Sequence, residues 1–209
     1  MEKILPNRSR NLAALLSATA LTALSGAAAL AAGPAATPAQ PKGPFYPLQL
    51  PAEQDADLAS VAGRQARGEP IVVTGRVLRR DGTPVGNAQV EIWQTNAYGR
   101  YHHEHDDSPA PYDPGFQGWG RTTTDAAGQY RFRSVKPIAY SGRAPHIHLA
   151  VTAPGGRTFY TQLYLADAAE NGRDFLYARL SQAEQAQLAV RLEPAAEGQP
   201  TARFDIVLP

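Results

Sequence analysis

Cysteine is absent from this chain of 209 residues, and methionine occurs only once. Without cysteine the protein can form no disulfide, offers no thiolate to a metal ion and has no cysteine nucleophile. Any metal site must therefore be built from nitrogen and oxygen ligands. The formal net charge is only +1, so the charge balance does not favour a nucleic acid or another acidic partner.

Long apolar runs are also absent, except for one near the N-terminus. Residues 11–32 carry no charge and follow a basic segment at residues 1–10. A basic segment, an apolar run and the small-x-small sequence at 29–31 are the layout of a secretory signal peptide, which we expect over residues 1–31. A membrane anchor is the alternative, but the run is rich in Ala, Ser, Thr and Gly, so we expect no stable anchor.

The rest of the chain has the length of one domain. Residues 32–42 are rich in Pro and Ala and are expected to form an extended or disordered linker. Residues 43–209 are long enough to bury a hydrophobic core of their own. With a signal peptide in front of it, this domain is expected to be periplasmic or secreted.

The domain sequence is dominated by short runs of β-branched and aromatic residues separated by Gly, Pro, Asp and Asn. This pattern predicts an all-β domain, an antiparallel β-sandwich with long active-site loops. The longest such loop is expected at residues 99–120, which are polar and rich in aromatics. Ser181 and Glu184 form a capping box, and with the segment at 166–180 they predict one or two short helices near the C-terminus.

Two histidines stand one residue apart in RAPHIHLAV, residues 143–151. Side chains at positions i and i+2 of a strand point to the same face, so His146 and His148 aim at one place. Such a pair can chelate a metal ion through two nitrogens, or it can be two half-buried polar residues.

Tyr101 closes the run WQTNAYGRY, which leads from an expected strand into a loop. Tyr140 comes shortly before the strand that contains the two histidines. These two tyrosines could add two oxygen ligands. Tyrosine is a poor ligand while protonated, because its ordinary pKa is near 10. A hard, strongly acidic cation can remove that proton, and ferric iron is the biological ion best suited to two phenolates and two imidazoles. The residues therefore favour Fe(3+) if they meet in space.

Five segments, taken in order, resemble the intradiol ring-cleavage dioxygenases, and the set is far more specific than any one of them. The resemblance implies a β-sandwich that uses non-haem Fe(III) and O2. It also implies the reaction, cleavage of a catechol ring between its two hydroxyls to give a muconate-type diacid. The matching segments are GPFYP, VTGRVLRRDGTPVGNAQVEIWQTNAYGRY, FQGWGRTTTDAAGQYRF, KPIAYSGRAPHIHLAV and TFYTQLYL.

The resemblance also implies the role of each site residue. It assigns the metal ligands as Tyr101, Tyr140, His146 and His148. It assigns catalytic roles to Tyr140, which would leave the metal when substrate binds, to Arg143, whose charge would face the substrate ring, and to Gln162 in the pocket. It places Gly43, Pro44 and Tyr46 with Arg143 at the substrate-binding mouth. A surface salt bridge is the alternative for Arg143.

Two features set the chain apart from well-known members of that family. Only two residues separate Tyr140 from Arg143, where the protocatechuate enzymes have a longer insertion. The sequence also shows no long N-terminal helical region of the kind that catechol and hydroxyquinol enzymes have. We therefore expect a compact, protocatechuate-like member, and a homo-oligomer because the family is usually oligomeric.

Other interpretations of the sequence stay open. The segments at 73–93 and 124–132 also resemble transthyretin-like β-sandwiches, so a non-catalytic binding module is one alternative. An exported metal-binding protein with the same ligands is another. The loop that contains His102, His103 and His105 could be a second site for zinc or copper, although such histidine-rich loops are usually solvated.

Overall fold

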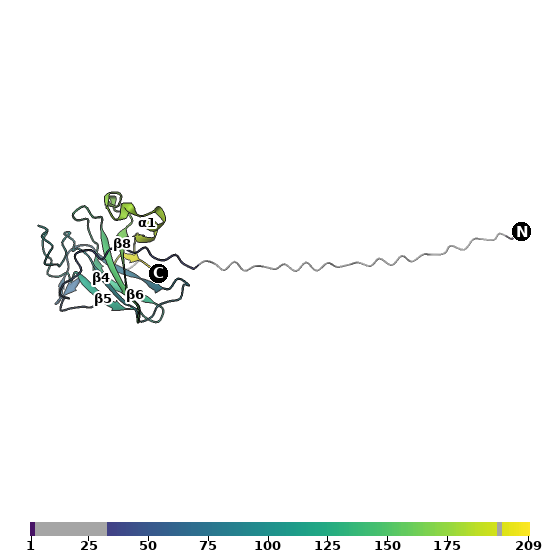
Figure 1. The fold of residues 1–209 in the computed structure, drawn as a ribbon, viewed down its shortest axis with the longest axis horizontal. Helices are drawn as coiled ribbons and strands as arrows, with labels where there is room; N and C mark the ends of the chain where they lie inside the picture. Colours follow the sequence, from purple (N-terminus) through teal and green to yellow (C-terminus); the bar gives the residue numbers. More distant parts are fainter. Residues whose placement is uncertain (3–32, 196–197) are drawn as a thin grey trace. The chain divides into compact units, whose positions relative to one another are not determined.

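The computed structural model describes residues 1–2, 33–195 and 198–209. The expected signal peptide therefore lies almost entirely outside the described residues, which include no helix long and apolar enough to cross a membrane. The described residues from 33 onward belong to one compact unit. Its strands, drawn in Figure 1, make two five-stranded sheets and one small hairpin.

The first sheet is organised around the long strand β3, Pro70–Leu78. β3 pairs antiparallel with β6 and parallel with both β11 and β12. The remaining strands are β6 (Gln129–Val135), β10 (Leu192–Glu193), β11 (Thr201–Arg203) and β12 (Ile206–Val207).

The second sheet has the strand order β5-β4-β7-β8-β9. Its first four strands are antiparallel, whereas β9 lies parallel to β8. The predicted β-sandwich is confirmed, with parallel pairing confined to short C-terminal strands. The strands are β4 (Gln89–Trp93), β5 (Trp119–Thr123), β7 (His146–Thr152), β8 (Thr158–Leu165) and β9 (Ala189–Val190); the hairpin is β1 (Ser60–Val61) with β2 (Arg64–Gln65).

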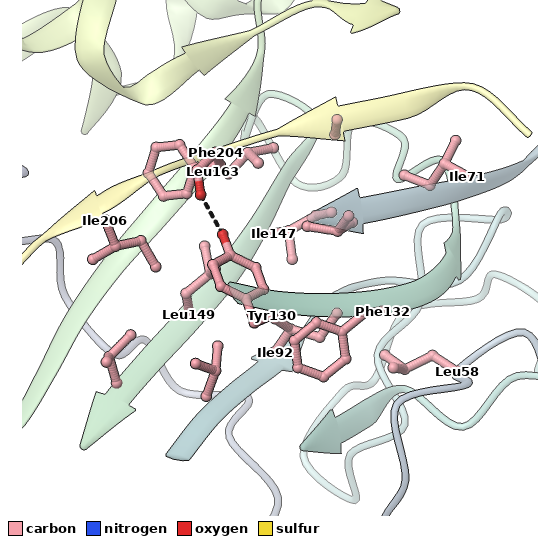
Figure 2. Packing of buried hydrophobic residues seen from close by; sticks show 14 of the residues in the cluster. Leu58, Ile71, Ile92, Tyr130, Phe132, Ile147, Leu149, Leu163, Phe204 and Ile206 are labelled. Atoms are coloured by element: carbon pink, nitrogen blue, oxygen red, sulfur yellow. Dashed lines mark hydrogen bonds between the residues drawn. The ribbon is translucent and has the colours of Figure 1, made fainter. Parts of the chain in front are cut away.

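The hydrophobic core lies between the two sheets. Figure 2 shows Phe132 of β6 on one side and Ile147 and Leu149 of β7 on the other, with the Tyr130 hydroxyl donating a hydrogen bond to the carbonyl of Phe204. Each fully buried aliphatic or aromatic side chain contributes about 1.5–3 kcal/mol relative to an exposed one. The core therefore fixes which face of β7 is turned inward.

Alternate side chains of strand β7 point to opposite faces of the sheet, and both faces are buried. Ile147, Leu149 and Val151 belong to the core. His146 and His148 point to the other face and are each only 2% exposed. The core packing of β7 thus positions the two histidines together on its outer side.

The predicted short helices are confirmed. The α-helix α1, Gln182–Leu188, begins at Ser181, whose hydroxyl accepts from the Glu184 N–H while the Glu184 carboxylate accepts from the Ser181 N–H. Two turns of 3-10 helix precede it, η1 at Ala169–Arg173 and η2 at Tyr177–Arg179. Figure 1 shows α1 beside β8.

Residues 33–47, here called the N-terminal arm, run along the sandwich without forming a helix or a strand. The arm hydrogen-bonds to β12 through Thr37 and to β8, where Gln40 donates to the Tyr160 carbonyl at 3.0 Å and Thr161 donates to the Pro38 carbonyl at 2.8 Å. These hydrogen bonds hold the arm against the domain at residues 37–40.

Candidate metal centre

His146 and His148 converge through their Nε2 atoms, which lie 3.1 Å apart. The Nδ1 atom of His146 lies 2.6 Å from the carbonyl oxygen of Ala144. A carbonyl can only accept, so Nδ1 carries the proton and Nε2 presents its lone pair. One ion held about 2 Å from each nitrogen fits the observed separation.

Tyr101 and Tyr140 bring their rings to the same place. The Tyr101 hydroxyl lies 3.4 Å from His146 Nε2. The centroid of the Tyr140 ring lies 5.1 Å from that of Tyr101 and 5.7 Å from that of His146. The four side chains expected to bind metal, which come from three separate parts of the sequence, therefore form one cluster.

The electrostatics of the cluster suit a hard cation. Burial, and then the charge of Arg143, lowers the pKa of His146 to about 4, and burial lowers the pKa of His148 well below its usual value. Both imidazoles are thus kept in the neutral form that binds metal. Burial raises the pKa of Tyr101 well above 10, so a phenolate at this position requires a compensating positive charge.

One buried polar atom of the cluster has no hydrogen-bond partner within the described residues. His148 Nδ1 is buried and makes no hydrogen bond there, whereas its Nε2 faces His146. The donor set of two neutral imidazoles and two phenols, with no thiolate, is the set that ferric iron favours. The residues present therefore fit that ion.

Aromatic rings and one glycine form the wall around the cluster. The Trp93 ring stacks on His148 at 4.9 Å with an interplanar angle of 8°. Phe45 stacks on Tyr101 at 4.7 Å. Gly43 lies over His148, because a Cβ added to it would be 3.1 Å from His148 Cε1. The motif GPFYP contains Phe45, but nothing in that motif alone marks this residue as a neighbour of Tyr101.

The other two residues expected at the substrate mouth lie farther from the histidines. The Tyr46 hydroxyl donates to Glu91 at 2.7 Å, and its ring meets Trp93 edge-on at 5.1 Å. Tyr46 is therefore behind Trp93 with its hydroxyl occupied. Pro44 is exposed in a turn of the N-terminal arm. Substrate binding by Gly43, Pro44 and Tyr46 stays a prediction.

Arg143 is held on two sides. Its Nε donates to Asp174 Oδ2 at 2.8 Å, and its Nη2 donates to Gln162 Oε1 at 2.8 Å and to the Tyr164 hydroxyl at 3.1 Å. Both charged side chains of the ion pair are buried, 9% and 0% exposed, so a surface salt bridge is not what Arg143 makes. Sequence reasoning gave no signal for Asp174.

Gln162 uses both ends of its amide within the protein. Its oxygen accepts from Arg143, and its nitrogen donates to the Pro41 carbonyl of the N-terminal arm at 3.0 Å. In this structure Gln162 therefore links the arm to Arg143. Its expected catalytic role stays a prediction, and the contact that the structure shows is with the arginine.

Tyr140 and Arg143 occupy the two ends of one tight turn. The Arg143 N–H donates to the Tyr140 carbonyl at 2.7 Å, and the Tyr140 N–H donates to the Arg143 carbonyl at 3.2 Å. Ser141 has φ 43° and Gly142 has φ 77°, as a type I′ turn requires. The short spacing in the sequence thus places the tyrosine and the arginine beside each other.

The histidine-rich loop does not form a second metal cluster. His102 stacks on Tyr112 at 4.3 Å, and His103 meets Phe45 edge-on at 5.6 Å. No group of three or more His, Cys, Asp or Glu in the described part of the chain could hold a metal ion. The loop instead positions Tyr101, whose N–H donates to Asp106 Oδ2 at 2.6 Å.

The fold and the cluster together define a class of protein, a β-sandwich with a buried candidate site for a hard metal ion. The family model described as Dioxygenase matches residues 42–209. The chain is 40% identical over 169 residues to the protocatechuate 3,4-dioxygenase beta chain of Burkholderia cepacia, an alignment that covers 76% of this chain and 72% of that one. The chain belongs to the intradiol ring-cleavage dioxygenase family.

Further relatives agree with this membership. The chain is 33% identical to catechol 1,2-dioxygenase 2 of Acinetobacter lwoffii over 68% of its own length, but it spans only 56% of that protein. The dioxygenase domain of a dioxygenase carbohydrate-binding protein fusion from Streptomyces sp. SirexAA-E superposes with a TM-score of 0.65 at 28% identity, covering 83% of this chain and 98% of that one. The resemblance drawn from the sequence is confirmed, and a non-catalytic module or a metal carrier is not favoured.

Proposed function

We propose that this chain is an Fe(III)-dependent enzyme that cleaves a catechol between its two hydroxyls with O2. The observation that carries the proposal is the convergence of Tyr101, Tyr140, His146 and His148. The family uses non-haem iron and acts on catechols with O2. The proposed reaction joins one catechol and one O2 into one muconate-type diacid, so both oxygen atoms enter the product and no other oxidant is needed.

The four clustered residues would hold the iron. When bound, ferric iron would supply a Lewis acid that draws electron density from the catechol ring and prepares the ring for attack on dioxygen. His146 and His148 contribute neutral nitrogen donors because burial disfavours their protonated forms. Tyr101 is fixed through its backbone by Asp106, so it stays in place while substrate binds.

Tyr140 is the tyrosine suited to leave the metal. It is only partly buried and ends a turn with an exposed tip, whereas Tyr101 is 2% exposed. Burial raises the pKa of Tyr140 above its ordinary value. A Tyr140 phenolate in this environment would therefore hold a proton readily, and the hydroxyl of an incoming catechol would supply that proton.

Arg143 would place a fixed positive charge beside the ring of the bound catechol. Its Nε and Nη2 are occupied by Asp174, Gln162 and Tyr164, while its Nη1 makes no hydrogen bond within the described residues. A preorganised cation stabilises negative charge that develops in the transition state. Arg143 thus favours attack by the electron-rich ring without having to reorient.

The proposal is tested with the purified chain. The iron-loaded protein should be coloured, because phenolates bound to ferric iron absorb visible light. Catechol added without air should shift that absorption, and air should then start oxygen uptake. A panel of catechols with and without a ring carboxylate identifies the substrate. Iron-loaded protein that consumes no oxygen with any member of the panel contradicts the proposal.

Single substitutions test the ligands. Tyr101→Phe and His146→Ala should each abolish iron retention, because each removes one donor. Tyr112→Phe is the matched control, since Tyr112 lies in the same loop and is exposed. Iron contents equal to the wild type in Tyr101→Phe would remove Tyr101 from the ligand set.

We also propose that residues 1–31 are a signal peptide and that the mature enzyme is exported. The basic segment, the uncharged run and the small residues at 29–31 support this. N-terminal sequencing of the protein from a periplasmic or extracellular fraction should begin near residue 32. A homo-oligomer is the expected assembly state, and light scattering on the same sample measures it.

A further inference from the structure

Asp174 is the most completely satisfied buried acid near the candidate metal centre. Its Oδ2 accepts from Arg143 Nε and from the Ala144 N–H, both at 2.8 Å. Its Oδ1 accepts from the N–H groups of Leu176 at 2.9 Å and Tyr177 at 3.0 Å. Its side chain is 0% exposed. Each carboxylate oxygen therefore has two donors, and the side chain has a single orientation.

This carboxylate connects two segments that flank the site. Asp174 follows η1 and precedes η2, while Arg143 and Ala144 lie between the Tyr140 turn and β7. Both hydrogen bonds at Asp174 Oδ2 have an ionised acceptor; the one from the Ala144 N–H holds the carboxylate, and the one from Arg143 Nε holds the guanidinium from that side. Gln162 and Tyr164 fix it from the Nη2 side.

We propose that Asp174 is a positioning residue that sets the orientation of the Arg143 guanidinium during ring cleavage. This inference rests on the proposed function, because it assigns Arg143 a role beside the substrate ring. Among the described residues, Asp174 forms no hydrogen bond with any of the four clustered side chains. Its one side-chain partner is Arg143; a second route to the cluster runs through Ala144, whose carbonyl meets His146 Nδ1, and the Arg143→Ala background distinguishes the two routes.

The orientation of the guanidinium matters because its three nitrogens have different partners. With Nε and Nη2 both occupied, Nη1 is the nitrogen left for substrate. Without Asp174, the guanidinium can rotate about its last torsions and exchange the nitrogen that faces the ring. A misplacement on the order of 1 Å can lower a rate by about a hundredfold.

The test is a double-mutant cycle between Asp174→Asn and Arg143→Ala in the iron-loaded full chain. Asparagine keeps the shape but presents an NH2 group to one pair of donors, so that pair loses its acceptor. We expect Asp174→Asn to keep wild-type iron content and visible absorption and to lower kcat by about ten- to a hundredfold. In the Arg143→Ala background it should lower kcat no further.

A purely structural role gives a different result. Asp174→Asn would then lower kcat by the same factor in both backgrounds, and that outcome overturns the proposal. An unchanged kcat in the wild-type background also overturns it. Asp57→Asn is the control, because Asp57 holds Arg133 at 2.9 Å in another part of the sandwich.

A second variant decides the matter if Asp174→Asn does not fold. Arg143→Lys keeps the positive charge and leaves Asp174 its three backbone donors. A lysine ammonium cannot bond both sides at once as the planar guanidinium does. We expect it to lower kcat nearly as much as Arg143→Ala, and wild-type turnover would overturn the proposal. Failure of the wild type itself to consume oxygen would instead contradict the proposed function.

Discussion

Gly43→Ala tests whether the N-terminal arm shapes the metal centre. Gly43 has φ 75°, a left-handed conformation. A residue with a Cβ adopts it at a cost of about 1–2 kcal/mol, which the lower entropy of alanine in the unfolded chain offsets by about 0.4–1 kcal/mol. The net loss is about 1 kcal/mol, or about 2–4 °C in Tm for a domain of this size.

The new methyl group also meets the candidate ligand. It would lie 3.1 Å from His148 Cε1, closer than a comfortable contact between carbon atoms at about 3.5–4.0 Å. His148 is stacked on Trp93 and has little room to move. We therefore expect Gly43→Ala to shift the visible absorption of the iron-loaded protein and to speed the loss of iron to a chelator.

Gly155→Ala separates the two effects. Gly155 has φ 69°, yet a Cβ there meets no atom within 4 Å. It should show the same loss of stability with unchanged colour and iron retention. Thermal unfolding measures the first quantity, and absorption with chelator competition measures the second. If the two variants retain iron equally and share one spectrum, the contact between Gly43 and His148 does not influence the site.

Three further predictions concern stability. Ser141→Asn should raise the free energy of unfolding by about 0.5 kcal/mol in denaturant titrations, because Asn-Gly is the favoured pair for the type I′ turn that Ser141 enters at φ 43°; a loss would contradict the turn assignment. Ser181→Ala should cost about 1 kcal/mol through loss of the α1 cap, whereas Ser181→Thr should cost less. Burial alone would raise the pKa of Asp174, but hydrogen bonds from Tyr177, Ala144 and Arg143 outweigh it and lower that pKa below its ordinary value. The stability that Asp174 adds over Asp174→Asn should hold above about pH 4 and fall as the pH drops through the lowered pKa; a difference independent of pH down to acid unfolding would refute this.

The strand pattern and local spacing predicted much of the site. His146 and His148 share a face by the alternation of side chains along a strand. The core face of β7 follows from the same alternation, because Ile147 lies between the two histidines. These features depend on neighbours in sequence, which is why they could be inferred without a structure.

Other features depend on contacts between distant segments. Asp174 lies 31 positions after Arg143, and nothing in its own segment marks it as a partner. Phe45 reaches Tyr101 only because the N-terminal arm is held by β8. The parallel pairing of β9, β11 and β12 was not predicted, because the alternation of side chains along a strand does not encode the direction of its neighbour.

Strand β7 contributes side chains both to the hydrophobic core and to the candidate metal centre, so the stability of the fold and the binding of an ion would be coupled. Its odd-numbered residues Ile147 and Leu149 fill the interior, and its even-numbered His146 and His148 face the cluster. An ion bound only by the folded chain adds RT ln(1 + [ion]/Kd) to the free energy of unfolding. A loosened interior at Ile147 would therefore weaken ion affinity, and ion withdrawal would lower the melting temperature. If the proposed iron is bound there, the ion content of a preparation and its melting temperature should change together.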